Sequence, residues 1–141
     1  MVGPDKETPL FFLIFREHTR KVLTELLSEH LYHPVVLMDP DDLVAALKGL
    51  ERATVFLDCE AILRYGPGLY SRIKVASPGS RIILLCHKEH QEHREIIRQA
   101  MEIGVYACLL APVEDWEVLA MVRHAPSPRP TRRRVTRRKT S

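Results

Sequence analysis

The stretch from Thr54 to Asp58 (TVFLD) constrains the fold of this chain more than any other segment. Its β-branched and aromatic residues form an apolar run, which predicts a strand buried on both faces, as in a parallel sheet. The run ends in a carboxylate, Asp58. We therefore expect Asp58 at the carboxyl edge of the sheet, where open α/β folds keep their ligands.

Four further apolar runs of strand length accompany this segment. They cover residues 10–15, 35–38, 81–86 and 105–110. Apolar residues at helical spacing predict five helices between and after the strands. Strands that alternate with helices through short connections favour a parallel sheet with right-handed crossovers. We therefore predict an α/β, flavodoxin-like doubly wound five-stranded parallel sheet, of order 2-1-3-4-5, with five helices.

Two of the helices carry specific expectations about burial. The first is expected to turn one apolar face inward, made of Val22, Leu23, Leu26 and Leu27. The last, over residues 113–124, is expected to bury Trp116, Leu119 and Val122. The apolar spacing favours a core position for Trp116, and the alternative is an exposed anchor for a partner.

Composition divides the chain into three parts. Residues 1–9 are expected to be a flexible N-terminus, residues 10–125 the folded domain, and residues 126–141 a disordered basic tail. The net charge is +3, but seven of the 21 Lys and Arg residues lie in the tail, which has no acid. The remaining 14 basic residues face 18 acidic ones, so the rest of the chain carries a net charge of −4.

Several classes of protein are excluded by what the sequence lacks. There is no apolar run of membrane-spanning length, and we expect no signal peptide. Three cysteines, an odd number, suit a reducing cytoplasm better than a disulfide scaffold. There is also no glycine-rich phosphate loop after the first strand, no nucleophile elbow and no metal signature. We therefore expect a cytoplasmic protein that is not an enzyme and needs no cofactor.

Residues at the ends of the predicted strands give the chain a resemblance to a known family. Leu57-Asp58 ends the central strand, Gly66 precedes the next helix, and the segment from Gly104 to Pro112 ends the fifth strand. In these positions, residues 10–125 resemble the receiver domain of two-component response regulators, of the chemotaxis-regulator type. The resemblance implies that Asp58 occupies the phospho-acceptor position, and that Pro112 belongs to the family's Lys-Pro pair.

The resemblance also implies a phosphorylation pocket, from which this chain departs. In receivers two acids after the first strand hold Mg²⁺, and a hydroxyl and a lysine bind the phosphoryl oxygens. The corresponding residues here are Arg16-Glu17, Cys86 and Ala111, and Cys108 occupies the family's aromatic switch position. A guanidinium beside the site disfavours a metal ion. We therefore expect a degenerate pocket, in which Arg16 pairs with Asp58 or Glu17 in place of the ion.

These departures favour a stand-alone pseudo-receiver, a phosphorelay-type signal-transduction module that acts by protein–protein interaction. The resemblance implies that its partner, a histidine kinase, an output protein or a second copy, binds the face made by the fourth helix, fifth strand and fifth helix. Four residues are candidates for that face: Arg94, Arg98, Tyr106 and Trp116.

Two other functions remain open. The chain could be an atypical receiver that is still phosphorylated on Asp58 with Mg²⁺, Arg16 supplying the positive charge of the missing lysine. It could instead be an adaptor whose basic tail, residues 126–141, binds nucleic acid or an anionic surface. Because the tail has no aromatic residues, such binding would be non-specific.

Two side-chain groups near the pocket admit a functional and a structural interpretation. Cys86 and Cys108 lie on neighbouring predicted strands and could form a redox pair, although buried cysteines are usually small apolar residues. Histidines follow the fourth strand, with His18 across the pocket, and could bind a metal. Their spacing matches no zinc signature, so a solvated loop is favoured.

Overall fold

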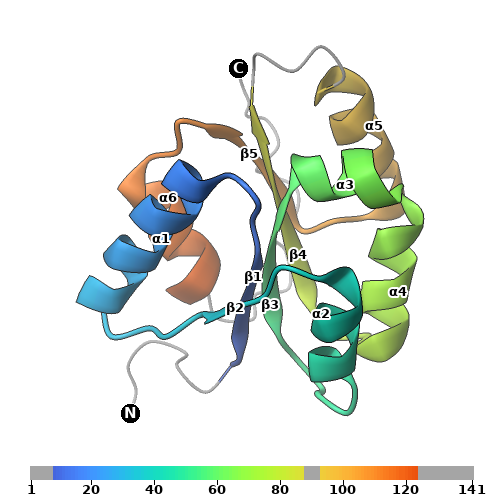
Figure 1. Cartoon of the computed structure of the whole chain (residues 1–141), viewed down its shortest axis with the longest axis horizontal. Coiled ribbons are helices and arrows are strands. Elements are labelled where there is room, and N and C mark those ends of the chain that lie inside the picture. The colour runs from blue at the N-terminus through green and yellow to red at the C-terminus, as the bar shows by residue number, and fades with distance from the viewer. Residues whose placement is uncertain (1–7, 88–92, 124–141) are drawn as a thin grey trace.

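The computed structural model describes residues 8–87 and 93–123 (Figure 1). In this part of the chain there are five strands and six helices. Their bounds are β1 Leu10–Leu13, α1 Glu17–Glu29, β2 Val35–Val36, α2 Pro40–Leu47, β3 Thr54–Asp58, α3 Cys59–Tyr65, α4 Gly68–Ala76, β4 Arg81–His87, α5 His93–Ile103, β5 Ala107–Ala111 and α6 Asp115–Arg123. The expectations for the first seven residues and for the basic tail lie outside the described residues.

The five strands form one parallel sheet in the order β2-β1-β3-β4-β5. This confirms the fold class and the strand order that the sequence predicts. β3 lies in the middle of the sheet, where Phe56 pairs with Phe12 of β1 and with Ile83 of β4. All five of its residues are buried, as expected of a strand covered on both faces.

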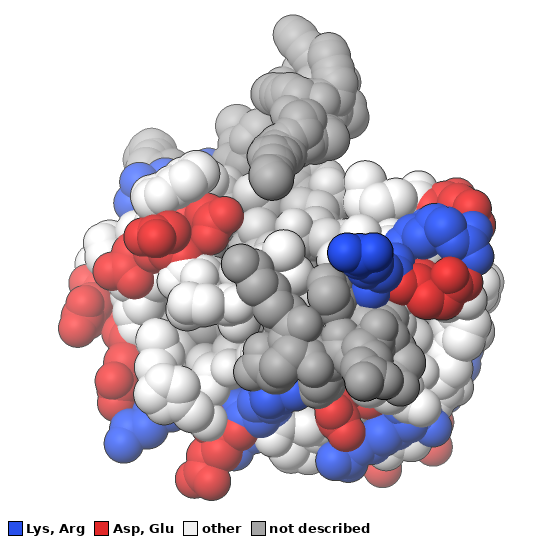
Figure 2. All heavy atoms as spheres, turned by 90° about the horizontal axis from the view of Figure 1, so that it is seen from above, with Lys and Arg blue, Asp and Glu red and all other residues white. Residues whose placement is uncertain are grey.

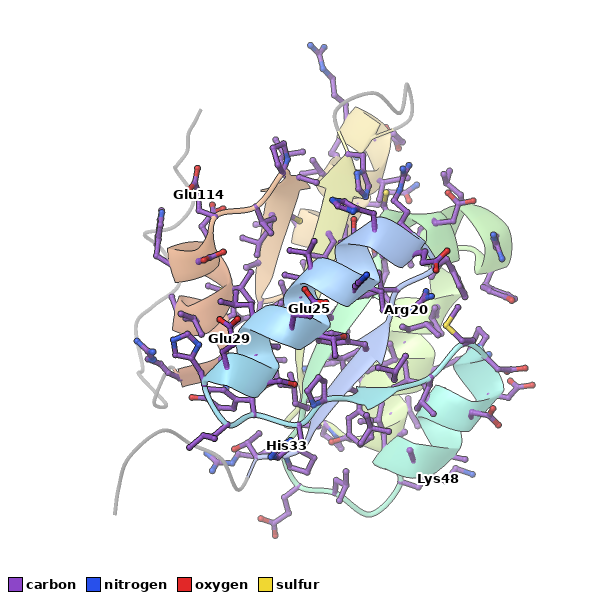
Figure 3. All side chains as sticks on the ribbon, turned by 60° about the vertical axis from the view of Figure 1, so that its left-hand side comes forward. Arg20, Glu25, Glu29, His33, Lys48 and Glu114 are labelled. Atoms are coloured by element: carbon purple, nitrogen blue, oxygen red, sulfur yellow. The ribbon has the colours of Figure 1, made fainter. Side chains whose placement is uncertain are left out.

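Helices cover both faces of the sheet (Figure 1). α1 and α6 pack on one face, and α2, α3, α4 and α5 pack on the other. Successive strand residues point to opposite faces, so Phe12 and Phe56 meet under α1 while Val55 and Leu57 face the other helices. In Figure 3 the exposed side chains of Glu25 and Glu29 project outward from α1.

The sixth helix, α3, was not expected from the sequence. It begins directly after β3, because the Asp58 side chain accepts the N–H of Glu60 and caps it. It ends at Gly66, whose positive φ of 86° suits a helix terminus. The extra helix shifts the numbering, so the expected fourth-helix face is here the surface of α5, β5 and α6.

Two expectations are wrong in detail. β2 covers only Val35 and Val36 and not residues 35–38, because the chain turns away to start α2 at its Asp39 cap. Both valines are exposed on this edge strand. In α1 the predicted residues Leu23, Leu26 and Leu27 are buried. Val22, at the margin of the apolar face, is 42% exposed.

Trp116 is the clearest correction to the predicted core. Its side chain is 68% exposed, whereas α6 buries Val118 and Val122. The helix is therefore rotated from the orientation in which Trp116 would point inward.

None of the helices in the described ranges is long and apolar enough to cross a lipid bilayer.

Candidate functional site

Asp58 lies at the carboxyl edge of the sheet and is completely buried. Its Oδ2 accepts the backbone N–H groups of Phe15, at 3.0 Å, and of Arg16, at 3.1 Å. Its Oδ1 accepts the backbone N–H of Glu60 at 3.2 Å. One carboxylate therefore connects the end of β3 to the loop after β1 and to the first turn of α3.

These bonds give Asp58 a structural task. A carboxylate that attacks phosphorus must present an oxygen to the phosphoryl donor, in line with the leaving group. Here each carboxylate oxygen is already directed at main-chain N–H groups, and the side chain is shielded from solvent. Asp58 is therefore both a helix cap and an anchor for the loop after β1.

The two residues at the metal-binding positions begin α1. Arg16 is its half-buried N-cap residue, and Glu17 is its exposed first residue. The bond from Arg16 to Asp58 is made by the main-chain N–H of Arg16. Ion pairs join Arg64 to Glu60, Arg72 to Asp41, and Arg98 to both Glu95 and Glu102. The pairing of the Arg16 guanidinium with Asp58 or Glu17 remains a prediction.

Cys86 stands where the family has a hydroxyl, and it is buried in the core under α3 and α4. Because Asp58 pairs with Leu85 across β3 and β4, the next residue, Cys59, lies opposite Cys86. A hydrogen bond with the Cys59 thiol and burial together raise the pKa of Cys86. A neutral thiol directed at another thiol gives a phosphoryl group little stabilisation.

The third cysteine, which is partly buried, lies near Cys86. Cys108 lies on β5, with its Sγ 3.8 Å from Sδ of Met101, and burial raises the pKa of Cys108 to about 12. Burial, followed by the proximity of the three thiols, raises the pKa of Tyr70. Since thiolates are the reactive form, these raised pKa values disfavour the redox interpretation.

The lysine position provides no cation. Ala111 is the last residue of β5, where it pairs with His87, and its methyl group has no donor for a phosphoryl oxygen. Pro112 follows it and is exposed.

Figure 2 views the molecule from above, onto this edge, and shows acidic side chains gathered on the side of α1 and α6. The first turn of α6 contains two acidic residues, Asp115 and Glu117.

The four residues predicted for the interaction face do not form one group. Arg98 makes ion pairs along its own helix, and Arg94 is exposed. Tyr106 precedes β5, at the amino edge of the sheet, where the guanidinium of Arg81 lies over its ring at 5.2 Å. Trp116 follows β5, at the opposite edge. Three further exposed apolar residues lie on α5 and β5 and were not predicted for this face: Met101, Ile103 and Leu110.

The metal interpretation depends in part on side chains that the structure does not describe. In residues 8–87 and 93–123, no group of three or more His, Cys, Asp or Glu side chains could hold a metal ion. His87 is buried in β4, and His18 is exposed on α1. The remaining histidine side chains after β4, His90 and His93, lie outside the described part.

Comparison with solved structures identifies the fold. The receiver domain of an HD-domain-containing protein from Pseudomonas fluorescens Pf-5 matches with a TM-score of 0.67 and 27% identity, over 84% of this chain and 94% of that one. The fold is that of a receiver domain. No protein-family model matches the chain, and no curated protein matches it in sequence.

Two further solved structures match in the same way. The receiver domain of a sensor histidine kinase from Pseudomonas aeruginosa PAO1, with a magnesium ion in its active-site cleft, has a TM-score of 0.67 at 16% identity, over 88% of this chain and all of that one. Full-length FixJ from B. japonicum has a TM-score of 0.66 at 23% identity. This match covers 84% of the present chain but only 57% of FixJ, so the present chain corresponds to part of that protein.

Proposed function

We propose that this chain is a receiver-like signal-transduction module that acts by contact with a protein partner, without a phosphorylation switch at Asp58. The observation that carries the proposal is the complete burial of the Asp58 carboxylate, combined with its three bonds to main-chain N–H groups. A residue that holds two loops in place cannot also be a freely reacting nucleophile without disturbing them.

The charge around Asp58 supports the same proposal. The similar receiver from Pseudomonas aeruginosa holds magnesium in its cleft, and such an ion needs several oxygen ligands. Among the pocket residues of this chain, Glu17 and Asp58 are acidic, Arg16 is basic and Ala111 is neutral. These four positions carry a net charge of −1, against −2 for three acids and a lysine. These four positions therefore attract a divalent cation less strongly. Ala111 also offers no ammonium group that could bind a phosphoryl oxygen.

The partner surface is proposed to be the face of α5, β5 and α6. Each of these elements contributes an exposed apolar side chain, namely Met101 at 48%, Leu110 at 38% and Trp116 at 68%. Exposed apolar and aromatic residues are typical anchors of protein interfaces. The partner on this face is a kinase, an output protein or a second copy of the chain. We further propose that the module has no catalytic activity of its own.

Restoring the pocket tests the assignment of its residues. The variant with Arg16→Asp, Cys86→Thr and Ala111→Lys regains the acid, hydroxyl and ammonium that receivers use. We expect Mg²⁺ binding by the variant and none by the natural protein, measured by calorimetry on samples shown to be folded by circular dichroism. Mg²⁺ binding by the natural protein would contradict the proposal. Failure of the folded variant to bind Mg²⁺ would contradict the assignment of the pocket positions.

A further inference from the structure

The sheet ends on one side at β2, whose outer edge pairs with no other strand of the described chain. Figure 1 shows this edge on the side nearest the viewer. The backbone N–H of Leu37 donates to the backbone oxygen of Phe12 of β1 at 2.9 Å. In a parallel ladder, successive residues direct their N–H and C=O groups to alternate sides of the strand. Val36 therefore directs its N–H and C=O away from the sheet, where a further strand would bond to both.

The side chains along this edge are apolar. Val35, Val36 and Met38 are all exposed, and residues 34–38 include no charged residue. Edge strands of monomeric proteins are usually protected against pairing by charged residues, above all lysine, or by proline. Between residues 34 and 38, Pro34 is the one residue of this kind. The edge from Val35 onward is therefore open to a partner.

The segment that leads into this edge begins with Leu31, which has an unfavourable backbone conformation. Its φ is 69°, in the left-handed region that favours glycine and that a branched side chain rarely adopts. Its side chain is also 61% exposed. A leucine here costs the monomer both backbone strain and exposed apolar surface, and strained residues cluster at functional sites. Contact with a partner would bury the side chain and offset this cost.

We propose that β2 pairs antiparallel with β2 of a second copy of the chain, about a twofold axis through Val36. The two Val36 residues then lie opposite each other and exchange two N–H···O bonds, as in a hydrogen-bonded antiparallel pair. A twofold interface needs a self-complementary surface, and Val36 presents one donor and one acceptor. Val35 of each copy lies opposite Leu37 of the other, so apolar residues meet. Since β5 forms the other edge of the sheet, this pairing leaves the face of α5, β5 and α6 uncovered.

The residues that flank the edge suit the same arrangement. His33 and Asp39 are both exposed, and they lie three residues before and three residues after Val36. A twofold axis through Val36 therefore brings His33 of each copy towards Asp39 of the other, where the imidazole donates to the carboxylate. Parallel pairing of two copies would place like residues together and lose this match. Because Pro34 has no N–H to donate, the ladder is short, and the dimer forms only at high protein concentration.

Sedimentation equilibrium of the full chain over a range of concentrations tests this proposal. We expect a reversible monomer–dimer equilibrium. Amide hydrogen exchange, followed by NMR, locates the interface. The N–H of Val36 should exchange about tenfold more slowly in the dimer, because its new hydrogen bond must open first. The N–H of Leu37 is already bonded within the sheet and serves as the internal reference.

Substitutions separate this edge from other surfaces. Val36→Lys brings two like charges together at the axis and should abolish the dimer, while the fold, checked by circular dichroism, is kept because the side chain is exposed. Val75→Lys, at an 81% exposed valine of α4, is the matched control and should leave the dimer intact. Trp116→Ala should leave it intact as well. A chain that stays monomeric at every concentration, a dimer that survives Val36→Lys, or one that is lost in Trp116→Ala would overturn the proposal.

Discussion

The carboxylate of Asp58 accepts the backbone N–H of Phe15 at 3.0 Å, which ties the end of β3 to the loop that follows β1. The neighbouring N–H of Arg16 binds the same oxygen, and the N–H of Glu60 binds the other. The residue that the receiver resemblance assigns to phosphorylation thus organises the loops around the site. This relationship makes Asp58 a determinant of stability.

Replacement of Asp58 by alanine should lower the free energy of unfolding by about 2–4 kcal/mol. It removes a helix cap and leaves three main-chain donors without their acceptor. Urea unfolding measures the change. Asp42→Ala, which removes an exposed acid in the first turn of α2, is the matched control and should cost less than about 1 kcal/mol. Equal stability of the Asp58 variant and the natural protein would show that the bonds contribute nothing.

Trp116 should behave as a surface residue. Because its side chain is 68% exposed, Trp116→Ala should change stability by less than about 0.5 kcal/mol. Val118→Ala, on the buried face of the same helix, should cost about 2 kcal/mol. The chain has one tryptophan, so quenching of its fluorescence by acrylamide reports on this residue alone. A shielded indole in the monomer would contradict the exposed position, whereas shielding that develops with dimer formation would identify a second copy as the partner.

The buried thiols should make the protein less stable at alkaline pH. The pKa of Cys108 is about 12 in the folded chain against an ordinary value of 9.0, and the pKa values of Cys86 and Tyr70 are raised as well. The unfolded chain therefore loses these protons first. The stabilisation is present below about pH 9 and is lost as the pH rises towards 12.

Urea unfolding at about pH 8 and about pH 10.5 measures this loss. Cys108→Ala removes one of the groups that titrate differently in the two states, and its stability should fall less over the same interval. The titratable groups that interact with Cys108 are Cys86 and Tyr70, which remain in the variant. Equal stability of the natural protein at the two pH values would contradict the raised pKa. So would a Cys108→Ala variant whose stability depends on pH in the same way as that of the natural protein.

The sheet could be predicted from the sequence because its signals are local. A strand buried on both faces needs an uninterrupted apolar run, and five such runs separated by amphipathic segments leave few topologies. β1 and β2 both end two residues before their predicted ends, and β5 begins two residues later than predicted. β2 is the shortest strand. As an edge strand it pairs on one side only, and the cap at Asp39 starts α2 soon after it.

The site was harder to predict, because a single residue type admits several roles. The position of Asp58 at the end of a strand predicts an acid at the ligand-binding edge of the sheet, and the same acid, with Gly66 eight positions later, is also a signal for a capped helix. The rotation of α6 depends on how it packs against α1 and the sheet, so its apolar spacing alone misplaced Trp116. The positions of the three cysteines along the sequence indicate that they lie near one another, but they do not establish which thiols are in contact.

The most direct test of the proposed function is the intact mass of the protein after incubation with acetyl phosphate and Mg²⁺. Asp58→Asn, which keeps one acceptor oxygen and is checked for folding, serves as the control. No adduct on the natural protein is the result we predict, since the carboxylate is buried and bonded and the pocket lacks its lysine. A phosphate adduct that is absent from the Asn variant would contradict the account and identify a working phosphorylation switch.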